Sequence, residues 1–439
     1  MSVSVIAIFD IGKTNKKVFL FDEDYTIRFE KSIQIAEIKD EDGFPCEDII
    51  ALSTWVTDSL TELLSLTDFE IKAINFSAHG ASFVNVDENG KPVTPLYNYL
   101  KPFPATLQSE FYSTYGGKNF AITTASPILG HLNSGMQLYW LKKERPDVFK
   151  KIKYALHLPE YLSWLVTKTF VSGITSIGCH TNLWDFTNNI YHSWVSQEGI
   201  TEKLAPILPS ESILKTKFNG GQIKSGIGLH DSSSALIPYL KYFTEPFVLI
   251  STGTWSISLN PFNHLPLTAE ELEQDCLCYL TYEGKPVKAS RLFAGQEHED
   301  VVKEIALHFK LPIDHYKKVV YDAGLVQHLQ QNKNNLSHLT ATSSFEEAYH
   351  LLILNLVKKQ KISTDLVIQN TSVNNIFVDG GFSQNEIYMK LLAQAFPTKK
   401  VYAASLHQAS ALGAAMVIHD HWNSGPLPKE IIQVINFSV

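Results

Sequence analysis

The chain has 439 residues, more than one ordinary hydrophobic core organises, so we expect two or three domains. Hydrophobic residues make up 44% and charged residues 19%, and the formal net charge of −8 argues against nucleic-acid binding through a broad basic face. No uncharged apolar run approaches the roughly 20 residues that cross a bilayer, and the N-terminus lacks the positive charge of a signal peptide, so we expect a cytoplasmic protein that binds no membrane.

Strand-rich and helix-rich segments alternate along the first part of the chain, which indicates an α/β architecture. Two apolar, β-rich runs flank a turn over residues 12–16, and apolar residues at helical spacing follow them. The expected strands cover residues 5–9, 18–21, 26–30, 71–77 and 83–86, and the expected helices cover residues 48–64, 134–143 and 160–167.

The motif DIGKTNKK (residues 10–17) joins the first two expected strands and is suited to phosphate and Mg²⁺. Gly12 lets backbone N–H groups approach a phosphate, and Lys13 and Thr14 add donors. Asp10 can hold Mg²⁺ through water. The motif is not a Walker loop, because it lacks the upstream glycine and joins two strands. Taken alone, it also fits a plain hairpin with a solvated turn.

The motif SAHGA (residues 77–81) places a histidine just past a strand that we expect to be buried. His79 could therefore hydrogen-bond a hydroxyl of a small polar ligand. A lone histidine is more often structural, so both interpretations stay open here.

Four cysteines are scattered along the chain, and the closest two are two residues apart. No second pair of cysteines or histidines supplies the spacing of a zinc site, so we expect reduced thiols. They are Cys46, Cys179, Cys276 and Cys278.

The motif GIGLHDSSSA (residues 226–235) sets a carboxylate after two glycines, near the expected end of the first domain. Asp231 could accept the proton of an attacking hydroxyl, which is the base required for phosphoryl transfer to an alcohol. The sequence also fits Asp231 as the N-cap of a helix over residues 232–240. Both roles can hold together.

Residues 245–261 repeat the opening pattern of the chain, with strands expected over residues 247–250 and 255–259. Their turn, in the motif STGTW (residues 251–255), again combines glycine with threonine, and Gly253 lies 241 residues after Gly12. This recurrence predicts two related domains that meet at a cleft, residues 1–243 and residues 244–439. Taken alone, STGTW also fits a plain β-turn. The polar stretch over residues 327–344 is expected to be a surface connection.

The motif VDGGFSQN (residues 378–385) runs from an expected strand into a helix over residues 386–396. A double glycine lets a flat nucleoside lie against bare backbone, and the helix start places N–H groups beside it. A simple strand-to-helix connection rarely needs this pattern, so we favour a nucleoside-binding role.

Eight segments, in order along nearly the whole chain, resemble the FGGY family of carbohydrate kinases within the actin-like ATPase superfamily. The two segments LYWLKKERP and LPEYLSWLVT favour this family over actin-like structural or chaperone ATPases. The segments are DIGKTNKK (10–17), SAHGA (77–81), LYWLKKERP (138–146), LPEYLSWLVT (158–167), His230-Asp231, STGTW (251–255), DGGFSQN (379–385) and ASALGAA (409–415).

The resemblance implies an α/β fold of two ribonuclease-H-like domains flanking a central cleft. ATP with Mg²⁺ would lie mainly on the second domain and the sugar on the first, and the chain could form a homodimer. Asp231 would be the catalytic base, and Asp10 and Asp231 would hold the metal. The implied nucleotide-binding residues are Gly12, Lys13, Thr14, Asn15, Thr252, Gly253, Thr254, Gly295, Gly380, Gly381, Gln384 and Asn385. The implied sugar-binding residues are His79, Glu160, His230 and Asp231.

The sequence departs from the family pattern at several positions. Lys13 stands where many relatives have threonine, and Glu160 stands where they have aspartate. His407 lies near the start of the closing helix, where an acidic residue is frequent, and residues 296–345 form a shorter segment than usual. None of these departures removes the expected base or a phosphate motif.

The resemblance favours an ATP-dependent ketose kinase acting on L-fuculose, L-rhamnulose or xylulose. A kinase of a linear polyol-type signalling molecule remains an alternative, because it would differ only in the acceptor pocket. A non-catalytic sugar-binding regulator with the same fold is a further alternative, which the presence of Asp10 and Asp231 disfavours.

Overall fold

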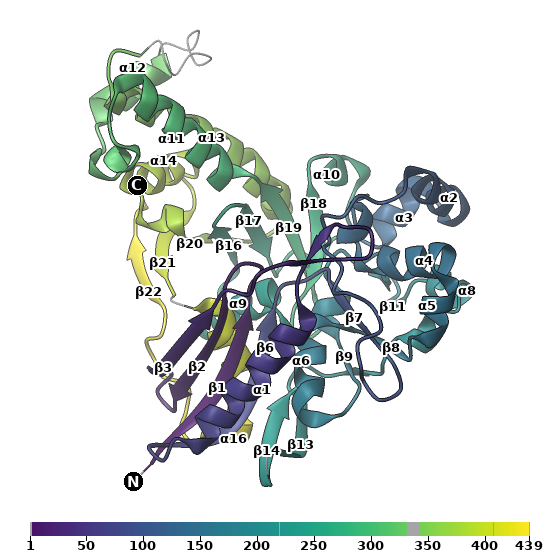
Figure 1. Cartoon of the computed structure of the whole chain (residues 1–439). Helices are drawn as coiled ribbons and strands as arrows, with labels where there is room; N and C mark the ends of the chain where they lie inside the picture. The colour runs from purple at the N-terminus through teal and green to yellow at the C-terminus, as the bar shows by residue number, and fades with distance from the viewer. Residues whose placement is uncertain (1, 219, 332–341, 407, 439) are drawn as a thin grey trace.

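Two mixed β-sheets organise the computed structural model of the chain, which describes residues 2–218, 220–331, 342–406 and 408–438 (Figure 1). The first sheet contains, in order, β13 (Ile213–Phe218), β14 (Gly221–Gly226), β6 (Phe69–Ala78), β1 (Val3–Ile11), β2 (Lys16–Asp22) and β3 (Ile27–Ile33), with β15 (Leu229–His230) beside β6. The second sheet contains, in order, β18 (Cys276–Leu280), β19 (Pro286–Leu292), β17 (Ser256–Asn260), β16 (Phe247–Thr252), β20 (Asn375–Gly380), β21 (Lys400–Ser405) and β22 (Gln433–Asn436).

Helices cover the faces of both sheets (Figure 1). Those in the first half of the chain are α1 (Ile49–Ser65), α2 (Ala105–Tyr115), α3 (Gly117–Thr123), α4 (Ser134–Glu144), α5 (Pro146–Lys151), α6 (Leu158–Thr167), α7 (Ile174–Ile177), α8 (Ser193–Gln197) and α9 (Asp231–Tyr242). Those in the second half are α10 (Ala269–Glu273), α11 (Ala294–Phe309), α12 (Ala323–Gln331), α13 (Phe345–Ile368), α14 (Glu386–Ala395), α15 (Ala409–Met416) and α16 (His419–Trp422). Short strands outside the sheets are β4 (Ile38–Lys39), β5 (Pro45–Cys46), β7 (Phe83–Val86), β8 (Tyr154–His157), β9 (Ser172–Gly173), β10 (Trp184–Asp185), β11 (Ile190–Tyr191) and β12 (Ile207–Leu208).

Strand β1 shows why the first sheet is covered on both faces. Successive side chains of a strand point to opposite faces, and every residue from Val5 to Phe9 is apolar and buried. Val5, Ala7 and Phe9 pack into the core that contains α1 and α6. Ile6 and Ile8 pack into a different core, which contains α9 and α15. The continuous apolar run therefore reflects burial on both sides.

Helices α9 and α15 form a layer that both sheets share. Phe247, Leu249 and Phe377 of the second sheet pack into the same core as Ile6 and Ile8 of the first sheet. The opposite face of the second sheet packs against α11, α13 and α14. The first sheet ends at His230 and the second begins at Phe247, so a domain boundary between residues 243 and 244 would lie in the connection after α9. That boundary stays a prediction.

Most expected elements of the sequence analysis appear within a few residues of their predicted bounds. Asp48 caps α1, because its side chain accepts hydrogen bonds from the backbone N–H groups of Ile50 and Ala51, and the helix therefore begins at Ile49. The four cysteines are free thiols, as predicted.

Two local predictions are corrected. His230 rather than Asp231 is the N-cap of α9, and Asp231 is the first residue inside the helix. The polar stretch over residues 327–344 is partly helical, because α12 continues to Gln331. Residues 332–341 of that stretch, like His407, lie outside the described residues.

Candidate active site

The turn between β1 and β2 carries the first group of predicted nucleotide-binding residues. The backbone N–H of Gly12 donates to the carbonyl oxygen of Asn15 at 3.0 Å, which closes the turn. The buried Lys16 ammonium donates to the carbonyl oxygens of Gly12 at 3.0 Å and Lys13 at 2.8 Å. Thr14 and Asn15 are exposed at the tip. The turn is thus fixed from its inner side, and its outer side stays accessible.

Asp10 is the penultimate residue of β1 and pairs with Ser77 of β6. The Ser410 hydroxyl, on α15, donates to the Asp10 carboxylate at 2.9 Å. The pKa of Asp10 is raised to about 6, chiefly by burial and in part by the negative charge of Asp231, whereas the hydrogen bonds from Ser410 and Ser77 act to lower it. The charge of one predicted metal-holding carboxylate therefore disfavours ionisation of the other.

Asp231 lies in the first turn of α9, where the helix dipole stabilises a negative charge. Its Oδ1 accepts a hydrogen bond from the backbone N–H of Ser232 at 2.6 Å and lies 3.3 Å from Nε2 of His230. The same nitrogen lies 3.3 Å from Sγ of Cys179. The side chain of Asp231 is 35% exposed, so one side of the carboxylate is held and the other faces solvent.

The hairpin between β16 and β17 carries the second group of predicted phosphate-facing residues. The backbone N–H of Gly253 donates to the carbonyl oxygen of Trp255 at 2.8 Å, and that of Gly295 donates to the carbonyl oxygen of Thr254 at 3.1 Å. A Cβ atom on Gly295 would lie 1.9 Å from the carbonyl oxygen of Gly253. Gly295 therefore allows the start of α11 to contact the hairpin directly.

Hydrogen bonds through Thr252 connect the double glycine at the end of β20 to this hairpin. Thr252 donates its hydroxyl to the carbonyl oxygen of Asp379 at 2.6 Å and accepts the N–H of Phe382 at 3.0 Å. Gly380 has φ +88°, and a Cβ atom there would lie 1.9 Å from the carbonyl oxygen of Thr252. Only glycine fits this turn, which leaves the neighbouring Gly381 open to the solvent side.

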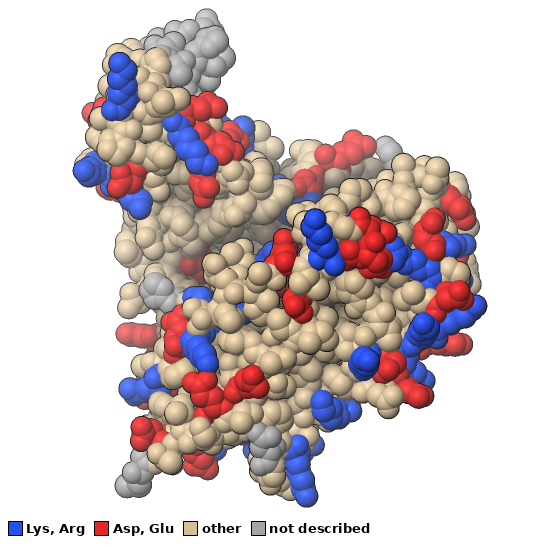
Figure 2. All heavy atoms as spheres, viewed as in Figure 1, with Lys and Arg blue, Asp and Glu red and all other residues tan. Residues whose placement is uncertain are grey.

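These segments enclose a cavity of about 840 Å³, formed entirely by residues of the second half of the chain. The volume is that of a site for a ligand of nucleotide size. Seven predicted residues line it: Thr252, Gly253, Thr254, Gly295, Gly381, Gln384 and Asn385. Figure 2 shows the molecular surface hollowed beside the part of the chain that carries α11–α13, with acidic and basic side chains interspersed on this face.

The cavity also contains residues that the sequence analysis missed. Tyr349 of α13 receives a hydrogen bond from the Asn385 side chain at 2.8 Å, and its hydroxyl lies 3.0 Å from Nε2 of His298. The rings of Tyr316 and Phe382 pack against His298. Lys317 and Lys318 lie on the wall formed by the 3₁₀ helix Ile313–Lys318 and the residues after it. Phe382 belongs to the motif VDGGFSQN but was not singled out there, and the other side chains come from segments without a recognisable local motif.

The predicted sugar-binding residues are largely buried in the first half of the chain. His79 and His230 are 7% and 5% exposed. Nε2 of His79 lies 2.8 Å from Oε1 of Glu47, and Nδ1 lies 3.1 Å from the carbonyl oxygen of Gly80. The ring of Tyr99 packs edge-on against His79 and lies below the Lys13 ammonium. The sequence analysis missed both Glu47 and Tyr99.

Glu160 requires a correction, because its side chain is fully buried and has no surface to offer a sugar. One carboxyl oxygen accepts a hydrogen bond from the Ser176 hydroxyl at 2.8 Å, and a Cβ atom on Gly173 would lie 2.2 Å from it. Burial raises the pKa of Glu160 to about 8. The place of Glu160 in the family motif implied that its side chain contacts a ligand, whereas in the structure the side chain packs inside the protein.

We expect Glu160→Gln to change how the stability of the protein depends on pH. The Glu160 carboxyl ionises near pH 4.5 in the unfolded chain but only near 8 in the folded one, so its contribution to the free energy of unfolding is lost as the pH rises between these values. Over this pH window the free energy of unfolding of the wild type should fall, relative to that of the variant, by on the order of a few kcal/mol. Urea unfolding at pH 5 and pH 8 measures the difference. The exposed Glu202→Gln is the control, and equal pH dependence in both variants would contradict the assignment.

In the part of the chain that the structure describes, no cluster of three or more His, Cys, Asp or Glu side chains could hold a metal ion. Among the same residues, no helix has the length and apolar character needed to span a bilayer.

Comparison with known proteins identifies two matching domain families. The N-terminal domain of the FGGY family of carbohydrate kinases matches residues 5–236, and the C-terminal domain of carbohydrate kinase FGGY matches residues 244–426.

Individual relatives agree with the family match. A rhamnulokinase from Halalkalibacterium halodurans is 26% identical over 260 residues, which is 56% of this chain and about half (52%) of that protein. An L-fuculokinase from Haemophilus influenzae is 21% identical over 94% of both chains. A carbohydrate kinase from Novosphingobium aromaticivorans has a similar structure, with a TM-score of 0.83, 23% identity and coverage of 100% of this chain and 95% of that one. The structural likeness confirms the predicted α/β fold.

Proposed function

The chain belongs to the FGGY family of carbohydrate kinases, and on this premise we propose that it transfers the terminal phosphoryl group of ATP to a hydroxyl of a ketose. The observation that carries the proposal is the nucleotide-sized cavity on the second half, combined with the carboxylates of Asp10 and Asp231 on the first half. L-Rhamnulose and L-fuculose are the first acceptors to test, since relatives are named for them, and xylulose is the third.

In this proposal Asp231 accepts the proton of the attacking hydroxyl. The carboxylate is partly exposed, and its Oδ1 is held by the Ser232 N–H, so the other oxygen can face a sugar. General base catalysis by a positioned carboxylate contributes about 10²–10⁴-fold to the rate. His79 and His230 would orient the sugar beside this carboxylate.

The nucleotide would lie in the cavity of the second half. Gly381, Gln384 and Asn385 would hold the nucleoside, and Thr252, Gly253 and Thr254 would face the phosphates. The turn Gly12–Asn15 would face the phosphates from the first half. Backbone N–H groups and hydroxyls at hairpin tips suit this task because they bind phosphate oxygens without adding charge.

Asp10 and Asp231 are the residues that would hold Mg²⁺. The charge of Asp231 raises the pKa of Asp10, and a cation between two such carboxylates would relieve their repulsion, so the pair fits the ion. Bound Mg²⁺ would neutralise charge on the phosphates. The kinase of a linear polyol and the non-catalytic sugar-binding regulator remain the alternatives.

Acceptor-dependent ADP release should test the proposed function. We expect one ketose of a panel of ketoses, aldoses and linear polyols to accelerate ADP release from Mg·ATP at least about tenfold over the rate without acceptor. A coupled assay for ADP measures this, with ATP binding followed separately by calorimetry. Stimulation by a linear polyol alone would favour that alternative. Binding of ATP and of sugar without any turnover would favour the regulator.

A further inference from the structure

Two ammonium groups and a histidine converge on one buried carboxylate beside the candidate active site. Glu47 is 7% exposed and lies between β5 and the start of α1. Its Oε1 is 2.8 Å from Nε2 of His79 and 3.2 Å from Nζ of Lys13, and its Oε2 is 2.8 Å from Nζ of Lys16. These partners reach Glu47 from two separate segments of the chain, the β1–β2 turn and the end of β6.

The contact with Lys16 links Glu47 to the shape of the β1–β2 turn. Lys16 is 2% exposed, and its ammonium donates to the carbonyl oxygens of Gly12 and Lys13 while it pairs with Glu47. A buried ammonium is costly without an opposite charge, so the carboxylate of Glu47 allows Lys16 to hold the turn from inside. The ion pairs hold the pKa of Glu47 well below its usual range, even though burial alone would raise it.

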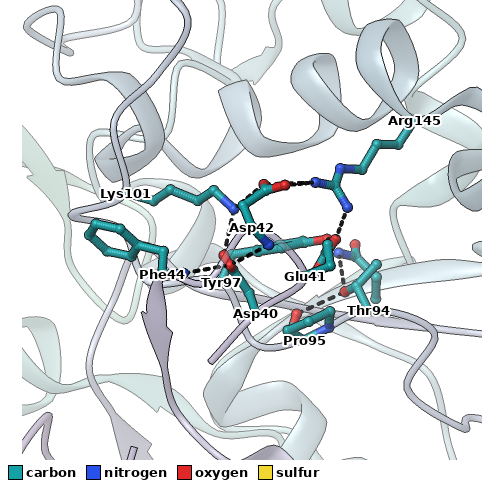
Figure 3. Close-up of polar contacts among 10 residues, drawn as sticks. Asp40, Glu41, Asp42, Phe44, Thr94, Pro95, Tyr97, Lys101 and Arg145 are labelled. Atoms are coloured by element: carbon teal, nitrogen blue, oxygen red, sulfur yellow. Dashed lines mark hydrogen bonds and ion pairs between the residues drawn. The ribbon is translucent and has the colours of Figure 1, made fainter. Parts of the chain in front are cut away.

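Ion pairs and hydrogen bonds of residues 40–42 hold the segment that carries Glu47 against neighbouring elements (Figure 3). Asp40 accepts a hydrogen bond from Lys101 at 2.5 Å, and Asp42 accepts one from the same ammonium at 2.6 Å. Arg145, at the end of α4, donates to both carboxylate oxygens of Asp42 at 2.7 Å and to Glu41. The Asp40 side chain has no exposed surface, so this end of the segment is fixed to the body of the first half.

We propose that Glu47 is a positioning residue that holds the phosphate-facing turn and the sugar-facing His79 in one arrangement. The inference rests on the proposed function, because it assigns the turn to the nucleotide and His79 to the sugar. No other described carboxylate contacts all three of Lys13, Lys16 and His79. Glu37, the second carboxylate at Lys13, lies 3.4 Å from it on the exposed side and contacts neither of the others.

Glu47→Gln keeps the shape of the side chain and removes its charge. We expect kcat to fall about 10–100-fold and the KM for the ketose to rise about tenfold, since small misplacements of binding groups have effects of this size. The Kd for ATP should rise about tenfold. The sign of the change in the Kd for ATP is decisive. A simple loss of negative charge would tighten ATP binding, because the ammonium groups of Lys13 and Lys16 stay behind, whereas a displaced turn would weaken it.

The matched control is Glu37→Gln, which removes a charge near Lys13 without touching Lys16 or His79. It should leave kcat and the ketose KM within twofold of the wild type and leave ATP binding unchanged or tighter. Glu47→Asp, which keeps the charge, should recover part of the lost kcat. In the Glu47→Gln background, a further His79→Gln change should raise the ketose KM less than twofold, because the two residues act as one unit.

The experiment measures ATP binding by calorimetry and turnover with L-rhamnulose and L-fuculose. Tighter or unchanged ATP binding in Glu47→Gln, or a fully additive effect of His79→Gln, would overturn the inference. If Glu47→Gln does not fold, Glu47→Asp takes its place, with smaller changes of the same sign expected in kcat, in the ketose KM and in the Kd for ATP. A wild type that binds ATP but turns over neither ketose would count against the proposed acceptors. The ATP-binding comparison would still decide the role of Glu47.

Discussion

Asp231→Asn is expected to lower kcat with the ketose by about 10²–10⁴-fold, the usual contribution of a general base. The asparagine has the same shape and can still accept the Ser232 N–H through its side-chain oxygen, so the start of α9 should be preserved. It cannot take a proton from the attacking hydroxyl. Initial rates at saturating ATP and ketose measure the effect.

ATP binding serves as the control for this variant, since the cavity is formed by residues 252–386 and lies on the other half of the chain. Because Asp231 is also proposed to hold Mg²⁺, the binding is measured with ATP in the absence of Mg²⁺, and the Kd should change by less than about threefold. Asp147→Asn on the surface of α5, where the side chain is 90% exposed, should leave kcat unchanged. If Asp231→Asn retained most of the wild-type kcat, another group would have to accept the proton.

Gly413→Ala is expected to destabilise the protein by about 1–3 kcal/mol, although alanine normally stabilises a helix relative to glycine by about 1 kcal/mol. The reason is the contact between α15 and α9. A Cβ atom on Gly413 would lie 1.8 Å from the backbone carbonyl oxygen of Ser234, so the helices must separate. Because α15 also carries Ser410, which donates to Asp10, we expect kcat to fall about tenfold or more.

The thermal midpoint and kcat of the purified variant measure these two effects. Gly324→Ala is the matched control, because Gly324 lies in α12 and its nearest neighbour would be the flexible side chain of Asp322 at 3.3 Å. This control should be neutral or slightly stabilising. A Gly413→Ala variant as stable as the wild type would show that the layer shared by the two sheets can adjust, which would contradict the close packing described here.

The parts of the site that the sequence predicted are those whose chemistry requires glycine. Gly295 and Gly380 each lie where a Cβ atom would meet backbone at 1.9 Å, so the segments around them have little freedom to vary. A Cβ atom on Gly253 would meet no atom closer than 4.0 Å, so the restriction comes from the two glycines that contact the hairpin rather than from Gly253 itself. Six residues from two such short motifs line one cavity together with Gly295, which only the family resemblance implied, because a glycine turn fixes both the local backbone and its distance from its neighbour.

Other parts could not be predicted because they depend on contacts between distant segments. Tyr349 reaches the site from α13, whose sequence shows only helical spacing, and the segment ASALGAA did not single out Ser410 as the partner of Asp10. Glu47 precedes a helix and looks like part of its start, yet its partners lie 31 to 34 residues away in sequence. The family motif implies that Glu160 binds the sugar. Its burial becomes evident only from its packing against Gly173, which lies 13 residues later in the chain.

Transfer of label from γ-³²P-ATP to a sugar tests the central claim most directly. The wild type and Asp231→Asn would be incubated with Mg·ATP and, in turn, L-rhamnulose, L-fuculose and xylulose, and the products separated by chromatography. We predict a labelled sugar phosphate with one of these ketoses, formed by the wild type and reduced at least about 100-fold in the variant. Label released only as inorganic phosphate, or no labelled sugar although ATP binds, would contradict the proposed kinase activity.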